Sequence, residues 1–158
     1  MEQIALNNAL ILSFPDGFRK LNDAELNQWR AAQSGASACF RDDDRHIIVS
    51  LGFRKEGLLS GLLNGNDLIK PAQRRMAWVM RAYGYQWLKE DTRLVGGKEA
   101  RCFQYTYTAQ GISMLGECCA IREGKILYYL HCYVRREYEE PGLQTWKDVL
   151  AKARWKKR

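Results

Sequence analysis

Histidine and cysteine carry out most nucleophilic, acid–base and metal chemistry near neutral pH, and here they stand in no catalytic pattern. The two histidines, His46 and His131, lie in no motif that pairs either with a nucleophile or a metal ligand. There is no Gly-x-Ser-x-Gly sequence and no glycine-rich phosphate loop ending in Lys-Ser or Lys-Thr. The sequence therefore predicts no catalytic residue and no cofactor, and it does not favour an enzyme.

The cysteines show no metal or redox spacing either. There are five, an odd number without a CxxC motif: Cys39, Cys102, Cys118, Cys119 and Cys132. We expect reduced, buried thiols that pack as small apolar side chains. If Gln110-Gly111 forms a two-residue turn, Cys102 directly faces Cys119, whereas a three-residue loop would place Cys118 opposite Cys102.

An acidic run, Asp42-Asp43-Asp44, is the one cluster of carboxylates that suggests a metal ion. A calcium loop also needs a spaced glycine and a terminal glutamate, and both are missing here. Aspartate readily accepts hydrogen bonds from nearby backbone N–H groups. We therefore interpret the run as a hairpin turn and predict no metal site.

The net charge of +7 and the isoelectric point near 9.3 raise the possibility of a nucleic-acid partner. From Lys147 onward there are six basic residues and one acidic residue, so this end supplies five of the seven net charges. The rest of the chain is close to neutral. A basic C-terminal tail, residues 154–158, is thus expected after a single domain of residues 1–153.

The start of the chain has no basic leader followed by a long apolar run, and no apolar stretch approaches the roughly 20 residues that span a bilayer. We therefore expect a cytoplasmic protein without membrane insertion. Its 158 residues suffice to bury a core without disulfide or metal cross-links.

Turn and cap residues divide the chain into strands and helices. Asn22 and Glu25 have the character of a helix start, and residues 67–83 show a clear helical stripe. A last helix is expected after Pro141-Gly142. Strands are expected within 2–14, at 36–41 and 45–54, and in a meander at 86–95, 99–109, 112–122 and 125–136.

Both faces of the meander strands carry apolar or aromatic residues, so we expect helices or a partner to cover each side of the sheet. The predicted fold class is α+β, with an antiparallel sheet of about six to seven strands flanked by helices in an α/β/α sandwich. The last helix should dock on the sheet, and Trp155 falls opposite its apolar stripe, frayed or available to a partner.

Three motifs spread along the chain carry a resemblance to a known family. They are Phe14-Pro15-Asp16-Gly17-Phe18, then Gly96-Gly97-Lys98-Glu99-Ala100 leading into Tyr105-Thr106-Tyr107, and the turn Glu123-Gly124-Lys125-Ile126. With this order of elements the chain resembles the PsbP-like superfamily, most of all its bacterial DcrB-like branch, which includes the Eag adaptors of type VI secretion effectors. The resemblance implies that this protein binds other proteins. The Eag adaptors bind hydrophobic helices. The basic tail and a leucine-rich segment depart from the family pattern.

That segment, residues 57–65, holds four leucines among three glycines: Leu58, Leu59, Leu62 and Leu63. If these leucines form an exposed apolar patch beside the sheet, the patch would suit an amphipathic or membrane-type helix of a partner. A loop folded over the core is the alternative. From this pattern and the resemblance we predict a non-enzymatic protein-binding adaptor or chaperone-like module.

A second candidate surface lies on the helix at 67–83, where Trp78 projects off the apolar stripe close to Arg74 and Arg81. An aromatic ring beside guanidinium groups can anchor a protein interface or stack on a nucleic-acid base. A simple surface contact between arginine and tryptophan is the plainer alternative. Nucleic-acid binding by this face and the basic tail is therefore the second functional hypothesis, and a homodimer through an exposed edge strand stays open.

Overall fold

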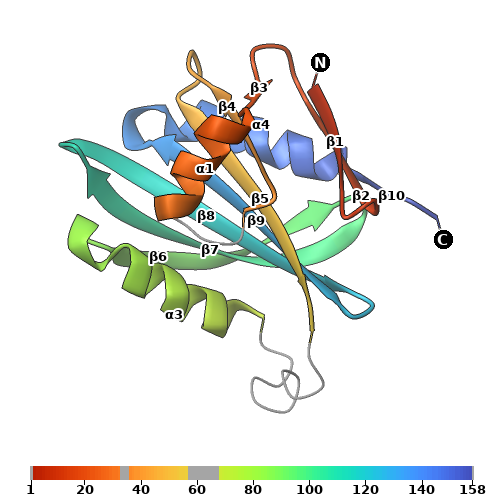
Figure 1. The fold of residues 1–158 in the computed structure, drawn as a ribbon. Coiled ribbons are helices and arrows are strands. Elements are labelled where there is room, and N and C mark those ends of the chain that lie inside the picture. The colour runs from red at the N-terminus through yellow and green to blue at the C-terminus, as the bar shows by residue number, and fades with distance from the viewer. Residues whose placement is uncertain (1, 33–35, 57–67, 158) are drawn as a thin grey trace.

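The computed structural model describes residues 2–32, 36–56 and 68–157, which form two antiparallel sheets and the helices packed around them (Figure 1). The strands are β1 (Glu2–Leu6), β2 (Leu10–Phe14), β3 (Arg19–Lys20), β4 (Ala38–Asp42), β5 (Ile47–Lys55), β6 (Gln86–Val95), β7 (Lys98–Ala109), β8 (Ile112–Glu123), β9 (Ile126–Arg135) and β10 (Arg154–Trp155). The helices are α1 (Asp23–Ala32), α3 (Ile69–Val79) and α4 (Glu139–Ala151), with short 3₁₀ turns η1 (Arg81–Tyr83) and η2 (Arg136–Tyr138).

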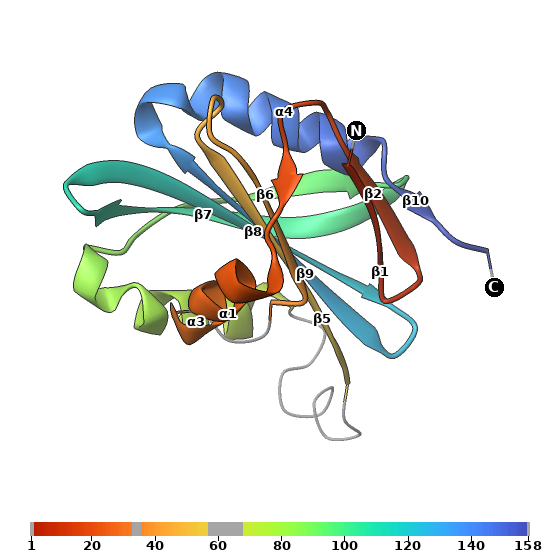
Figure 2. The same cartoon turned by 45° about the horizontal axis from the view of Figure 1, so that its top comes forward.

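The larger sheet has seven strands in the order β3-β4-β5-β9-β8-β7-β6. Helix α4 lies on one side of this sheet, whereas α1 and α3 lie on the other (Figure 2). This α+β arrangement confirms the predicted antiparallel sheet with helices on both sides. The predicted meander corresponds to β6–β9, and each expected turn joins neighbouring strands.

The turn between β7 and β8 consists of two residues, Gln110 and Gly111, with φ values of 52° and 77°. Positive φ at both positions matches the twist of a tight hairpin. In the resulting register Cys102 faces Cys119, as predicted for a two-residue turn, and Phe103 faces Cys118.

Helix α1 begins with a reciprocal cap. The backbone N–H of Glu25 donates to Asn22 Oδ1 at 2.9 Å, and the backbone N–H of Asn22 donates to Glu25 Oε1 at 3.1 Å. Two N–H groups without helical partners are thereby satisfied. The predicted helix start is confirmed.

The acidic run turns the chain between β4 and β5, as predicted. Asp42 is buried, and its Oδ1 accepts the backbone N–H groups of Asp44 at 3.0 Å and Arg45 at 3.1 Å. Its Oδ2 forms an ion pair with the Arg45 guanidinium. These contacts explain the position of Asp42 by turn geometry. Among the described residues, no group of three or more His, Cys, Asp or Glu side chains could hold a metal ion.

The C-terminus differs from the expectation of a free tail. Arg154 and Trp155 pair with Ile11 and Leu10 of β2, so the N-terminal hairpin and the chain end form a separate three-stranded sheet. The Trp155 indole N–H donates to the carbonyl oxygen of Val95 at 2.9 Å, and its ring packs edge-on against Tyr128. Trp155 is therefore fixed in the domain and is not frayed.

Each face of the seven-stranded sheet has its own core. On the α4 side, Trp146, Val149 and Leu150 belong to the core, and the helix packs against β2, β6 and β9. Gly142 allows α4 to approach closely, because a Cβ atom there would lie 2.5 Å from Val134 Cγ2. On the opposite side, α3 packs Ile69, Met76 and Met80 against the aromatic residues of β7.

One ion pair lies inside the α4 face. Glu117 on β8 is 0% exposed, and its Oε1 accepts hydrogen bonds from Arg93 at 2.7 Å and from the Gln104 amide at 3.0 Å. Arg93 also pairs with Asp91 at 2.8 Å. A buried carboxylate is tolerated only with such partners, since desolvation of an unpaired charge costs several kcal/mol.

We predict that Glu117→Ala destabilises the protein by about 3 kcal/mol, because it leaves the Arg93 guanidinium buried without its main partner. Chemical denaturation would measure the change. Glu90→Ala is the matched control, since Glu90 pairs with Arg101 at 3.1 Å on the exposed surface and should matter far less. Equal effects of the two substitutions would contradict the assignment.

Candidate binding site

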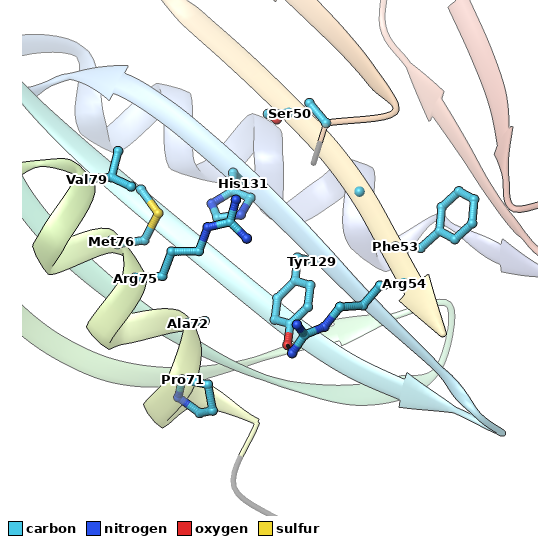
Figure 3. A pocket seen from close by; sticks show the side chains of 12 residues that line it. Ser50, Phe53, Arg54, Pro71, Ala72, Arg75, Met76, Val79, Tyr129 and His131 are labelled. Atoms are coloured by element: carbon cyan, nitrogen blue, oxygen red, sulfur yellow. Dashed lines mark hydrogen bonds between the residues drawn. The ribbon is translucent and has the colours of Figure 1, made fainter. Parts of the chain in front are cut away.

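A pocket of about 190 Å³ opens between α3 and the sheet (Figure 3). Its floor comes from two paired strands, with Ser50 and Gly52 on β5 and their register partners His131 and Tyr129 on β9. Helix α3 lies opposite this floor and lines the pocket through Ala72, Arg75, Met76 and Val79. The lining is mainly apolar, with two arginines, Arg54 and Arg75, at the mouth.

The pocket exists because α3 faces large side chains on one part of the sheet and small ones on another. Over β7 the helix meets Phe103, Tyr105 and Tyr107, which fill the space beneath it. Over β5 the alternation of the strand directs Ser50 and Gly52 toward the helix side. A hydroxymethyl group and a hydrogen atom leave a hollow beneath the side chains of α3.

His131 forms part of the floor and is uncharged near neutral pH. Burial, with a further contribution from the positive charge of Arg75, lowers the pKa of His131 to about 4. The ring nitrogen Nε2 lies 3.8 Å from Cys118 Sγ, and Nδ1 is buried without a hydrogen-bond partner among the described residues. A protonated ring would therefore present two donors to surroundings that offer one weak acceptor.

The contact between Cys118 and His131 joins the two residue types of a nucleophilic pair. Burial raises the pKa of the Cys118 thiol well above its usual range, so the thiol stays protonated. The neutral imidazole and the neutral thiol do not form the thiolate–imidazolium ion pair that activated cysteines use. The geometry supports packing at this contact.

The arginines differ in how they are held. Arg54 donates to the Tyr129 hydroxyl at 3.3 Å, and its guanidinium lies 5.6 Å from the centre of the Tyr129 ring. Arg75 extends from α3 toward His131 (Figure 3). The described lining residues include these two arginines and no aspartate or glutamate.

The predicted partner-binding residues divide into two groups. Leu58, Leu59, Leu62 and Leu63 lie outside the described residues. Arg74, Trp78 and Arg81 lie on α3 and η1, away from the lining of the pocket.

Trp78 is 65% exposed, and the Arg81 guanidinium lies 3.6 Å from the centre of its ring. Arg81 also donates to the Trp78 carbonyl oxygen at 2.7 Å. One face of the indole is thus already occupied by a contact within the chain, as in the plainer alternative for this surface.

Sequence reasoning did not select Arg54, Arg75, Tyr129 or His131 as site residues. The available signal was the placement of Ser50 and Gly52 two residues apart in the otherwise apolar stretch 47–53. Small residues on the helix-facing side of a buried strand predict missing volume. Which helix would lie above them depends on tertiary structure.

The edge strand β6 is poorly suited to adding another strand. The pairing register shifts between Trp87 and Lys89, which marks a bulge. At Thr92 the backbone N–H donates to Asp91 Oδ1 at 2.8 Å, and the carbonyl oxygen accepts from Arg93 at 3.0 Å. Bulges and local side-chain contacts of this kind disfavour edge-to-edge association.

Comparison with known proteins supports the fold. No family model matches the chain, and no curated protein sequence matches it significantly. The solution structure of cyanobacterial PsbP (CyanoP) from Synechocystis sp. PCC 6803 is similar with a TM-score of 0.67 and 13% identity, over 95% of this chain and 88% of that one. The chain therefore has a PsbP-like α+β fold.

Two further structures share this fold at low identity. LpqN of Mycobacterium tuberculosis, described as involved in cell envelope biogenesis, gives a TM-score of 0.55 at 12% identity, covering 94% of this chain and 83% of that one. A Bacteroides thetaiotaomicron protein gives a TM-score of 0.57 at 12% identity, covering 94% of this chain and 46% of its own.

In the described part of the chain, no helix is long and apolar enough to cross a membrane.

Acidification should reveal the state of His131. Its folded pKa near 4 lies below the unfolded value near 6.5, so the unfolded chain binds more protons between these values. Stability is therefore expected to fall by up to about 3 kcal/mol as the pH drops from 6.5 to 4.

His131→Gln should lack this part of the pH dependence, as measured by denaturant titrations at several pH values. His46→Gln is the matched control, because His46 stacks on Tyr138 and is not among the lining residues of the pocket. If His131→Gln and wild type lose stability in parallel, the imidazole is not buried in its neutral form.

Proposed function

We propose that this protein is a non-enzymatic binding module, adaptor-like or chaperone-like, that takes an apolar side chain of a partner protein into the pocket between α3 and the β5–β9 floor. The observation that carries the proposal is the pocket itself, with an apolar helical wall over a floor of small residues. Concave, mainly apolar sites with few polar groups are the usual binding sites of proteins.

The size of the pocket favours an anchor residue over a complete helix. Its volume of about 190 Å³ is below the roughly 300–1,000 Å³ of sites that enclose a drug-sized ligand. An α-helix with its side chains is about 10–12 Å across. A partner helix would therefore lie over the opening and insert one side chain, as in helix-in-groove recognition.

The resemblance to the DcrB-like branch and its Eag adaptors belongs to this proposal. It rests on the sequence motifs, whereas the similar structures support the fold. The leucine-rich segment and a cytoplasmic location remain predictions that accompany it.

Nucleic-acid binding is the second hypothesis, and the geometry favours it less. Stacking on a base needs an accessible aromatic face, and Arg81 occupies one face of Trp78. At the C-terminus, the Trp155 indole bonds to Val95 and Lys156 extends the pairing with the N-terminal hairpin. Salt-dependent binding to single-stranded DNA that is lost in Trp78→Ala would favour this hypothesis over the pocket.

Filling the pocket should weaken peptide capture. We expect a displayed library of random peptides to yield apolar binders on the wild-type protein, and Ala72→Leu to weaken them at least about tenfold, because its larger side chain enters the pocket. Affinities of the selected peptides would be measured by calorimetry.

Ala77→Leu is the matched control, since it is the same substitution on the same helix at a residue outside the lining. Its binding should equal that of the wild type. The proposal fails if Ala72→Leu binds the selected peptides as well as Ala77→Leu does, or if no peptide is selected.

A further inference from the structure

Two arginines lie at the opening of the pocket, one on the sheet side and one on the helix side. Arg54 comes from β5 and Arg75 from α3, and Figure 3 shows them at different places along the pocket. Glu56, the acidic residue just after β5, pairs with Arg122 at 2.5 Å. None of the described lining residues carries a carboxylate.

We propose that the pocket recognises the C-terminal residue of its partner, with the apolar side chain inside and the terminal carboxylate against Arg54. This inference rests on the proposed function, because it specifies which apolar residue of the partner enters. The occupant is thus a chain end with a free carboxylate and an aliphatic side chain.

Arg54 is held in place for this role. Its contacts with the Tyr129 hydroxyl at 3.3 Å and with the Tyr129 ring at 5.6 Å restrict a side chain that would otherwise sample many rotamers. A planar guanidinium matches the two oxygens of a carboxylate, and a pre-positioned donor loses less entropy on binding. Arg75 adds positive potential from the other wall.

The apolar part of the site suits an aliphatic side chain. Met76 and Val79 of α3 line the pocket together with Pro71 and Ala72, all on the helix side. Across from them, Ser50 and Gly52 provide space at the floor. A side chain that enters between them loses apolar surface to water, which is favourable at about 25 cal/mol per Å².

A chain end fits this volume better than an internal segment. An internal residue brings two flanking peptide groups, each with an N–H and a C=O that must find partners when buried. A terminal residue brings one chain and replaces the second with a carboxylate, for which the arginines are the partners. The small volume and the positive charge thus point to the same occupant.

The experiment compares one short N-acetylated peptide ending in leucine, made with a free carboxylate and with a C-terminal amide. Binding is followed by chemical shifts in NMR spectra of the complete protein, with the His131 ring protons as reporters of the pocket. We expect the free acid to bind about tenfold more tightly than the amide, as a charge-assisted hydrogen bond provides.

Arg54→Gln should reduce this preference to less than about threefold, whereas Lys55→Gln, the same charge change at the next residue of β5, should keep it. Arg75→Gln and Arg74→Gln form a second pair on α3, in which only the first residue lines the pocket. Thermal melting of each variant checks that it is folded.

The possible results separate the two proposals. Equal binding of acid and amide overturns the carboxylate inference and leaves apolar capture intact. Absence of binding by both peptides overturns both. Isocaproic acid, which has the same side chain and carboxylate, tests the source of the group, and its binding in the absence of peptide binding would overturn the assignment to a partner's C-terminus.

Discussion

The central constraint on this structure is a sheet whose middle strands are buried on both faces. Side chains of β8 and β9 are mostly apolar whichever way they point, because α4 lies on one side and α3 on the other. Glu117 is a charged exception, and its carboxylate is retained in the core by Arg93 and Gln104. The helices, in turn, are stabilised by burying their apolar side chains against the sheet.

The pocket lies above β5, where the sheet does not fill the space beneath α3. Helix α3 is fully supported over the aromatic residues of β7, but above β5 it meets Ser50 and Gly52. No added motif is needed to form a binding site there, since the absence of two larger side chains is enough. The positive charge of the opening then comes from residues on the two separate walls, Arg54 and Arg75.

Local signals in the sequence predicted much of the fold. The Asn22–Glu25 cap, the Asp42–Asp44 turn and the two-residue turn at Gln110-Gly111 each depend on residues within a few positions of one another. The pairing of Trp155 with the N-terminal hairpin and the meeting of Arg75 with His131 depend on distant segments. Periodicity reports which face a residue occupies, but it does not report what lies opposite, so these features escaped prediction.

Burial also sets the protonation of His131 in the pocket and of its neighbour Cys118. It raises the pKa of the Cys118 thiol and lowers that of the His131 imidazole, and both shifts favour the uncharged form. The packing that stabilises the sheet thus disfavours the thiolate of Cys118 and the imidazolium of His131. Arg54 and Arg75, in contrast, are exposed residues at the opening. Neutral groups at the floor and arginines at the opening are the features on which the proposed binding of a terminal carboxylate rests.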